Sequence, residues 1–382
     1  MNAFGDELAD WLRLTLTPGI GDITARKLLS AFGLPCDVLS QSQTALRQVV
    51  SPAQAAALHA EPPRLADTIA QTLKWLAAEE HGGAATHRIV TLGDPGYPVA
   101  LLEMADPPLM LYLIGPAAFD LTQLGNSIAM VGSRNPTPQG ELNARDFGRA
   151  FGELGIPVVS GLALGIDGAA HQGALDAVGT HTDRPATVAV VGTGLDRIYP
   201  ARHHALAHRI TAHGLIVSEF PLGTPPLNQN FPKRNRIIAG LSRGTLVIEA
   251  ALLSGSLITA RLASEQGREV FAIPGSIHSP QARGCHALIR QGAKLVESVN
   301  DVLEELQPEV RAPHRQEATQ IDDDAGDDGL LQRLGFDPVG LDALCARTGQ
   351  PAAALQAELL GLELDGHIAR LPGGLFQRIA QR

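Results

Sequence analysis

Short apolar runs alternate with longer helical patterns between residues 88 and 296, and this alternation constrains the fold more than any other feature. The runs lie at 88–92, 127–131, 157–160, 187–191, 215–218, 245–248, 270–273 and 294–296, and helical patterns such as 139–154 and 203–213 separate most of them. Strands that alternate with helices indicate βαβ units. We therefore predict an α/β fold with one Rossmann-like, doubly wound, mainly parallel sheet over residues 87–306.

A small helical domain is predicted over residues 1–86. Within it, Gly19, Ile20 and Gly21 lie between two amphipathic segments, a pattern that resembles a helix-hairpin-helix. The glycine turn of such a motif exposes backbone N–H groups to a phosphate. A plain helical hairpin is the other interpretation, and it is favoured because few basic residues flank the turn apart from Arg26 and Lys27.

The C-terminal part predicts a flexible acidic linker, residues 307–328, followed by a winged-helix-like domain, residues 329–382. Seven acidic residues against two arginines give the linker a charge of −5, half of the net charge of −10. The domain reads as helix, turn, helix and β-hairpin, and its second helix, AAALQAELLGLELD, has no lysine or arginine. A DNA-reading helix normally turns basic or amide side chains toward the groove. We therefore expect this domain to dock a protein rather than read duplex DNA.

The charge and the cysteines limit the class of protein. A net charge of −10 argues against non-specific nucleic-acid binding by the whole surface but allows a local basic patch. Cys36, Cys285 and Cys345 are far apart and show no metal-ligand spacing, which favours reduced thiols in a cytoplasmic protein. We see no signal peptide and no apolar run long enough to span a bilayer, so we expect no membrane association. No metal site and no cofactor are predicted.

Loops of small residues follow five of the predicted strands. They span 132–136, 161–168, 192–196, 254–256 and 274–276. Glycine at a strand-to-helix turn permits close backbone approach, and the next helix N-terminus offers free N–H groups. Because the carboxyl ends of parallel strands share one edge, we predict a continuous phosphate-binding floor that includes Ser133, Gly161, Gly165, Gly192, Gly194, Ser254, Gly255, Ser256 and Gly275.

Basic side chains cluster in the segment FPKRNR, residues 231–236. Lys233, Arg234 and Arg236, with Arg134 after the second predicted strand, would bring positive charge to the same floor. Arginine forks suit phosphodiester oxygens, and backbone N–H groups need no particular base. For the cluster alone, a solvated helix end is an equally good interpretation.

Four polar side chains are candidates for catalysis: Asp167, His171, Asp196 and Glu249. Asp167 is placed at or near the start of a helix, where capping is the expected role. The sequence contains no P-loop, no Gly-x-Ser-x-Gly elbow and no HExxH, and no base is paired with the serines at 254–256. We therefore predict that the protein is not an enzyme.

Several of these motifs coincide in one order: GSR from Gly132, SGLALGIDGAAHQGAL from Ser160, GTGLDRIYP from Gly192, SEFPLG from Ser218, FPKRNRIIAGLS from Phe231, EAALLSGSLITARLA from Glu249, and AIPGS. Over residues 90–300 they resemble the DNA processing protein A (DprA/Smf) family. The resemblance implies a cytoplasmic protein that binds single-stranded DNA without sequence preference, protects incoming DNA, forms a homodimer and helps load the RecA recombinase during natural transformation.

The resemblance also implies which residues touch DNA. Arg134, Lys233, Arg234, Asn235 and Arg236 become the candidates for contact with the DNA backbone, and the glycines and serines of the loops would line the same groove. Phe231 is the one obvious stacking candidate near the patch, although a core position is slightly favoured for it.

An enzyme of a different class is the alternative. A Rossmann-like domain with Gly244-Thr245 followed by Glu249 faintly resembles the nucleotide-phosphate-processing enzymes of the lysine-decarboxylase-like type. The sequence lacks their Pro-Gly-Gly-x-Gly-Thr signature. A third interpretation, an adaptor that docks a partner through the winged-helix-like tail, is compatible with DNA binding.

Overall fold

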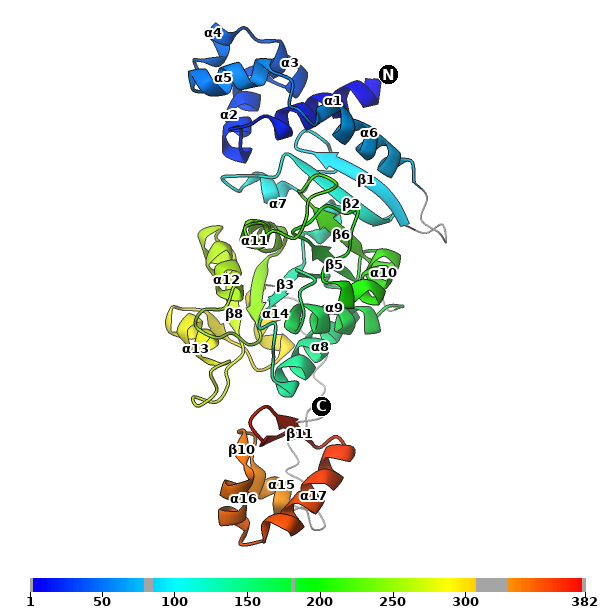
Figure 1. Ribbon diagram of the computed structural model, residues 1–382. Helices are drawn as coiled ribbons and strands as arrows, with labels where there is room; N and C mark the ends of the chain where they lie inside the picture. Colours follow the sequence, from blue (N-terminus) through cyan, green and yellow to red (C-terminus); the bar gives the residue numbers. More distant parts are fainter. Residues whose placement is uncertain (1–2, 79–84, 180–182, 307–328, 380–382) are drawn as a thin grey trace.

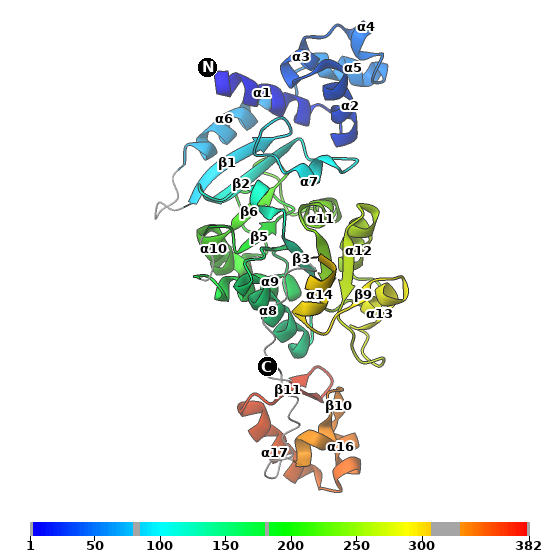
Figure 2. The same ribbon diagram turned by 180° about the vertical axis from the view of Figure 1, so that it is seen from behind.

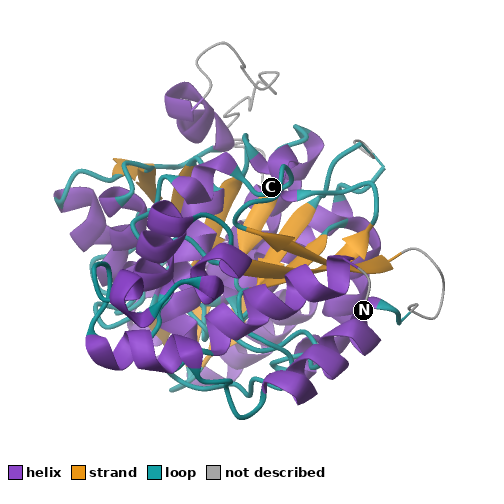
Figure 3. Ribbon diagram, turned by 90° about the horizontal axis from the view of Figure 1, so that it is seen from above, coloured by secondary structure: helices purple, strands orange, loops and turns teal. Residues whose placement is uncertain are grey.

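The computed structural model describes residues 3–78, 85–179, 183–306 and 329–379. Its centre is a nine-stranded sheet in the order β1-β2-β6-β5-β4-β3-β7-β8-β9, with helices on both faces (Figures 1 and 3). The predicted fold class, an α/β protein with a mainly parallel, doubly wound sheet, is confirmed.

Seven strands of the sheet are mutually parallel. They are β3 (Ile128–Val131), β4 (Val158–Ser160), β5 (Thr187–Val190), β6 (Leu215–Ser218), β7 (Gly244–Val247), β8 (Glu269–Ala272) and β9 (Lys294–Leu295). Strands β3 to β7 are buried along their whole length, because helices cover both faces. The predicted apolar runs therefore coincide with real strands.

Alternate residues of β3 show how the two faces are covered. Ala129 and Val131 share a core with Ile237 of α11 (Asn230–Leu241). Met130, between them, shares a second core with Phe151 of α8 (Pro138–Glu153). The other helices of this domain are α9 (Ile166–Asp176), η2 (Ala201–His203), α10 (His204–His213), α12 (Ser256–Glu265), α13 (Arg283–Arg290) and α14 (Val299–Leu306). Because side chains alternate along a strand, each face has its own helical layer.

Helix α8 begins where its sequence predicts a start. Thr137 is the N-cap, and its Oγ1 accepts a hydrogen bond from the Gly140 N–H at 3.0 Å. Pro138 occupies the first turn, where its missing N–H has no cost. The helix pattern predicted over 139–154 is thus confirmed, as is the pattern over 203–213 that forms α10.

The sheet is extended at one edge by an antiparallel pair that sequence analysis did not foresee completely. The run at 88–92 belongs to β1 (Ala85–Thr91), but no strand was predicted for β2 (Met110–Pro116), which pairs antiparallel with both β1 and β6. Short helical turns α7 (Val99–Leu102) and η1 (Leu121–Leu124) flank β2. Our predicted strands alternated with helices, and this hairpin does not follow that rule.

Six helices form the N-terminal unit over this antiparallel edge (Figure 2). They are α1 (Ala3–Leu16), α2 (Asp22–Phe32), α3 (Pro35–Ser40), α4 (Gln43–Leu46), α5 (Pro52–His59) and α6 (Leu65–Leu76). Their core contains Trp11 and Leu12 and includes Leu109 and Met110 at the start of β2. The helical unit therefore packs on the sheet through a shared apolar core, and the boundary at residue 86 stays a prediction.

The C-terminal unit contains the predicted helix, turn, helix and β-hairpin, preceded by a helix and a short strand that were not predicted. It consists of α15 (Gly329–Leu334), β10 (Val339–Gly340), α16 (Leu341–Thr348), α17 (Ala352–Leu364), β11 (Ile368–Leu371) and β12 (Leu375–Arg378). The strands form a small sheet in the order β10-β12-β11, and Gly349 ends α16 in the left-handed region. The winged-helix architecture is confirmed, whereas the predicted acidic linker lies outside the described residues. Within the described residues we find no helix that is both long and apolar enough to cross a membrane.

Candidate nucleic-acid interface

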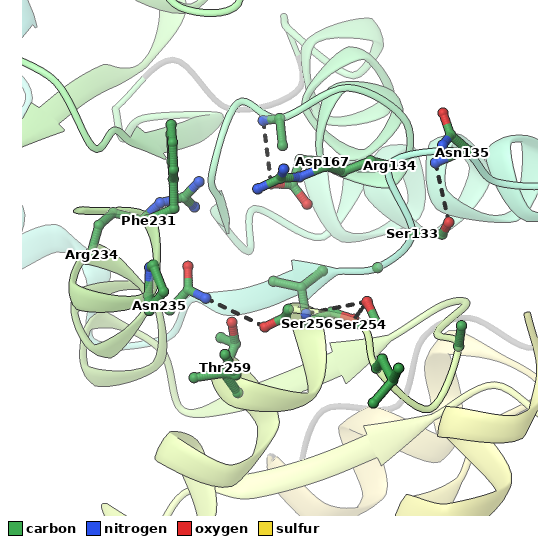
Figure 4. Close-up of a pocket in the computed structure, with 18 of the residues that line it drawn as sticks. Ser133, Arg134, Asn135, Asp167, Phe231, Arg234, Asn235, Ser254, Ser256 and Thr259 are labelled. Carbon is green, nitrogen blue, oxygen red and sulfur yellow. Dashed lines mark hydrogen bonds between the residues drawn. The ribbon is translucent and has the colours of Figure 1, made fainter. Parts of the chain in front are cut away.

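Strand β3 is the point at which the chain changes direction across the sheet. From β3 the chain continues to β4, β5 and β6 on one side, and it then returns to place β7 on the other side. Loops from the carboxyl ends of two such strands diverge, and ligands of open α/β sheets bind in the crevice between them. A pocket of about 540 Å³ lies at this crevice (Figure 4).

The pocket is built by four segments: the loop after β3, the loop after β4, the first turns of α11, and the loop between β7 and α12. Seven of the predicted site residues line it, namely Ser133, Arg134, Arg234, Asn235, Ser254, Gly255 and Ser256. Half of the predicted set is therefore brought together. Whether these residues bind DNA stays a prediction.

One wall of the pocket is the N-terminus of α12. Ser254 Oγ and Ser256 Oγ lie 2.7 Å apart, and the Ser256 N–H donates to Ser254 Oγ at 3.3 Å. Opposite them, Asn235 Nδ2 donates to the Gly255 carbonyl at 3.5 Å. A helix N-terminus leaves N–H groups without intrahelical partners and carries a partial positive charge. The two serine hydroxyls and the dipole of α12 therefore favour the binding of an anion at this wall.

Two arginines approach the pocket in different ways. Arg134 is exposed, and its Cζ atom lies 5.7 Å from the centre of the Phe231 ring. Arg234 is 5% exposed and donates from Nη2 to the Gly161 carbonyl at 3.0 Å. Burial lowers the pKa of Arg234 to about 10, although Asp167 opposes this change. The exposed Arg134 side chain can thus reach a ligand, whereas the buried Arg234 side chain is held within the fold by the Gly161 carbonyl.

Asp167 is the carboxylate that faces Arg234 in the pocket. It accepts a hydrogen bond from the Ala163 N–H at 3.3 Å, and the N-cap position of α9 belongs to Gly165 rather than to Asp167. Burial raises the pKa of Asp167, and Arg234 opposes that effect. The side chain therefore joins the loop after β4 to α11. It lies two positions after the N-cap residue, and not at the cap itself, where capping was the expected role.

Two members of the basic cluster point away from the pocket, which corrects the expectation of a single basic patch. Arg236 is 4% exposed and forms ion pairs with Glu219, with Asp22 at 3.0 Å and with Asp106 at 3.1 Å. Lys233 is paired with Asp22 at 3.1 Å and with Glu219 at 3.3 Å. Both cations therefore lie between the sheet domain and the start of α2.

The glycine turn of the N-terminal hairpin is engaged in the same contact. Asp22, directly after the turn, is the carboxylate that pairs with Arg236 and Lys233, and Arg26 donates to the carbonyls of Leu102 and Met104. The side chains beside this turn thus face the sheet domain. That arrangement agrees with the plain helical hairpin favoured by the sequence.

The predicted loop glycines that do not line the pocket are explained by contacts and backbone angles within the fold. A Cβ atom on Gly192 would lie 3.2 Å from the Phe231 ring, and one on Gly194 would lie 2.5 Å from Asp196 Oδ1. Gly165 has φ +78°, and Gly275 is backed by Ala282. The loops at 192–196 and 274–276 do not line this pocket, so a continuous floor of all five loops stays a prediction.

Several residues that line the pocket were not predicted from the sequence. Leu253 is fully exposed at the rim, and Thr259, Asn228 and Gln281 also line the pocket. Gln281 Nε2 donates to the Asn135 carbonyl at 3.2 Å and so ties two loops together. Leu253 directly precedes the Ser-Gly-Ser motif, but it follows other apolar residues, so neither it nor the others had a local signal.

The remaining catalytic candidates have internal partners. Glu249 accepts hydrogen bonds from the Thr137 N–H at 2.9 Å and from Thr137 Oγ1 at 2.5 Å, beside the N-terminus of α8. His171 is buried on Thr187, and burial lowers its pKa to about 3. Asp196 pairs with Arg197. Among the described residues, no group of three or more His, Cys, Asp or Glu side chains could hold a metal ion.

Comparison with known proteins gives matches over most of the chain. The family profile described as DNA recombination-mediator protein A matches residues 88–307, and the profile of the DprA winged helix domain matches residues 313–374. Protein Smf of Escherichia coli (strain K12) is 42% identical over 315 residues, which cover 80% of this chain and 80% of that protein.

Two solved structures are also similar to this chain. The X-ray structure of DNA processing protein A from Streptococcus pneumoniae matches with a TM-score of 0.63 and 35% identity, covering 80% of this chain and 99% of the other. DNA processing protein A from Helicobacter pylori, whose structure is described for its single-stranded DNA binding mode, matches with a TM-score of 0.51 and 29% identity over 59% of this chain and 98% of the other.

Proposed function

The chain belongs to the DprA/Smf family of DNA processing and recombination proteins, and from that premise we propose that its central pocket binds the backbone of single-stranded DNA without sequence preference. We also propose that the protein is not an enzyme. Its alternative, a nucleotide-phosphate-processing enzyme, needs an acid or base aimed at a substrate, and the carboxylates of Asp167 and Glu249 are occupied by contacts within the fold.

One observation carries the proposal: an exposed arginine faces a helix N-terminus with two serine hydroxyls across one open crevice. Arg134 on the β3 side and Ser254 and Ser256 on the α12 side line the same pocket. Guanidinium, hydroxyl and backbone N–H groups are all donors, and phosphate oxygens are acceptors only. Such groups position a nucleic-acid backbone and carry no information about the base.

Phe231 supports a single strand as the form of DNA. Its ring is half-buried, lies over Gly192, and is flanked by the Arg134 guanidinium. An unpaired base has a free face to stack on such a ring, whereas the faces of paired bases are covered by their neighbours. The position is therefore neither the plain core position that the sequence favoured nor fully exposed.

The cellular role follows the family. We propose that the protein acts in the cytoplasm as a homodimer, protects incoming single strands and helps to load the RecA recombinase during natural transformation. The winged-helix domain is assigned to protein docking, because Leu360 and Leu364 of α17 are exposed and the helix carries Glu358 and Glu363.

Fluorescence anisotropy of a labelled oligothymidine across a salt series tests the proposed function. We expect tight binding that weakens as salt rises, with a slope of about −0.7 per phosphate contacted. An unlabelled duplex of equal length should compete poorly. Competition by a mononucleotide alone would contradict the proposal and favour a closed nucleotide pocket.

A further inference from the structure

Helix α17 is apolar on two opposite faces. One face, with Leu355 and Leu359, is buried in the core of the C-terminal unit. The other face carries apolar residues at positions 353, 357, 360 and 364, and all four are exposed. A surface helix of a globular protein normally has one apolar face and one polar face. The described part of the chain therefore leaves one apolar face of α17 uncovered, at the periphery of this unit (Figures 1 and 2).

The four exposed positions form one straight apolar stripe along the helix. They are separated by four, three and four residues, so they fall within roughly 60° of one another around the helix axis. The apolar stripe consists of Ala353, Ala357, Leu360 and Leu364, and the two leucines are 51% and 80% exposed. Apolar residues with this spacing are typical of a helix that packs along a second helix. The apolar stripe therefore suits a helical partner.

A gap without a side chain lies beside the apolar stripe at Gly361. Glycine destabilises the interior of a helix. The fold does not require it here, because a Cβ atom on Gly361 would meet nothing within 4 Å. Gly361 also lines a hollow of about 560 Å³ between α17 and α15. The surface beside the two exposed leucines therefore has room for the side chains of a partner.

Acidic side chains border the apolar stripe on both sides. Glu363 lies on one side, and its Oε2 atom is 3.6 Å from Arg370 Nη2. Glu358 and Asp365 lie on the other side, beyond Gly361, and both line the hollow. The helix itself contains no lysine or arginine. Charges that flank the apolar seam between two helices determine which partner is accepted.

We propose that the apolar stripe docks an amphipathic helix of another protein, in which lysine or arginine side chains flank the apolar face. The inference rests on the assignment of the winged-helix domain to protein docking in the proposed function, and it names the chemistry of the partner. A second copy of this chain is the poorer occupant, because a twofold contact places the same surface on both sides and brings acidic side chains against acidic side chains. A basic side chain that enters the hollow instead meets Glu358 and Asp365.

Three labelled synthetic peptides test the inference. Two of them are helices with leucines at the spacing of the apolar stripe, flanked by lysines in one peptide and by glutamates in the other. The third has the composition of the lysine peptide in scrambled order and controls for its net charge. Binding to the full chain is measured by fluorescence anisotropy at physiological salt. We expect the lysine peptide to bind about tenfold more tightly than either of the others.

Leu360→Gln and Leu364→Gln remove apolar surface from the stripe and keep a good helix former at each position. Each variant should lower affinity for the lysine peptide about tenfold. Val99→Gln is the matched control, because Val99 is 71% exposed on α7 of another unit, and it should leave peptide affinity unchanged. The double variant Glu358→Gln with Asp365→Asn should reduce the preference for the lysine peptide over the glutamate peptide.

Gly361→Gln separates docking from a folding defect. It puts a long side chain into open space beside the stripe and replaces glycine by a better helix former, so it should keep the helix and lower peptide affinity. Unchanged peptide affinity in both leucine variants, or equal affinity for the lysine and scrambled peptides, overturns the inference. A change in the oligomeric state of the full chain on Leu364→Gln, measured by analytical ultracentrifugation, also overturns it, because a second copy would then be the occupant.

Anisotropy with oligothymidine separates this inference from the proposed function. All variants of α17 should bind the oligonucleotide as the wild type does. If the wild type fails to bind it, the DNA-binding function is contradicted, whereas the peptides alone decide the docking inference. If DNA binding is intact and the peptides are not discriminated, only the docking inference is contradicted. Weaker DNA binding by Leu360→Gln would contradict the assignment of the domain to protein docking.

Discussion

The Arg234 guanidinium occupies the space that any side chain on Gly161 would need. Arg234 Nη2 donates to the Gly161 carbonyl at 3.0 Å, and a Cβ atom on Gly161 would overlap Nη1 of the same guanidinium. Gly161 is therefore required by a buried arginine inside the protein and not by the close approach of a ligand backbone, which was the reason expected from the sequence.

Gly161→Ala should displace Arg234 and leave Asp167 buried without its charge partner. Forcing an extra side chain into a filled interior position costs about 1–3 kcal/mol, and we expect the free energy of unfolding, measured by urea denaturation, to decrease by that amount. Gly255→Ala is the control, since a Cβ there meets nothing within 4 Å. Equal stability of the two variants would contradict the assigned role of Gly161.

Arg134→Ala should weaken binding of single-stranded DNA by about 1–3 kcal/mol, as expected for a lost charge-assisted contact. Anisotropy with oligothymidine at low salt measures the effect. Arg243→Ala serves as the control because Arg243 is also exposed but precedes β7 at the opposite edge of the sheet. An equal loss in both variants would mean that only net charge matters.

Arg236→Met should destabilise the fold rather than impair DNA binding. It leaves Glu219 buried beside Asp22, and we expect a loss of about 3–5 kcal/mol in the free energy of unfolding. Lys233→Ala, which removes a half-exposed partner of the same carboxylates, should cost less than about 1 kcal/mol. A stable Arg236→Met protein with greatly reduced DNA affinity would restore Arg236 to the binding site.

His171→Gln should change how stability depends on pH. Burial, with His203 and Arg234 nearby, lowers the pKa of His171 to about 3, below its ordinary value of 6.5. Below pH 6.5 the unfolded chain binds a proton that the folded chain refuses, so the stability present above this pH is lost as the pH falls toward 3. Relative to the variant, the wild type should lose up to about 1.4 kcal/mol per pH unit in this range. Parallel curves from urea denaturation at several pH values would refute this.

Deletion of residues 330–382 should leave affinity for single-stranded DNA nearly unchanged. The second helix of that domain presents acidic and apolar side chains, including the 80% exposed Leu364, which suit a protein surface better than a phosphate backbone. Anisotropy with the truncated chain measures this. A tenfold loss, about 1.4 kcal/mol, would show that the domain contributes to DNA binding.

The architecture could be predicted because it depends on local patterns. Buried parallel strands read as continuous apolar runs, and the helices between them repeat every three to four residues. The loops at 132–136 and 254–256 could be brought together for the same reason, since their strands β3 and β7 run in one direction and are neighbours. Strand β2 was not predicted, because an antiparallel strand inserted at the edge of the sheet does not follow the alternation of strands and helices.

Sequence alone determined that a basic helix and glycine-serine loops meet at one edge of a parallel sheet, since strand direction and turn chemistry are properties of neighbouring residues. Only the tertiary structure decided which cations of residues 231–236 face the crevice. Successive helical residues point in directions about 100° apart, so one turn serves several surfaces. Arg236 is drawn to Asp22, 214 positions away in the chain, while Arg234 turns toward Gly161. Partners this distant in the sequence cannot be predicted from the pattern of neighbouring residues.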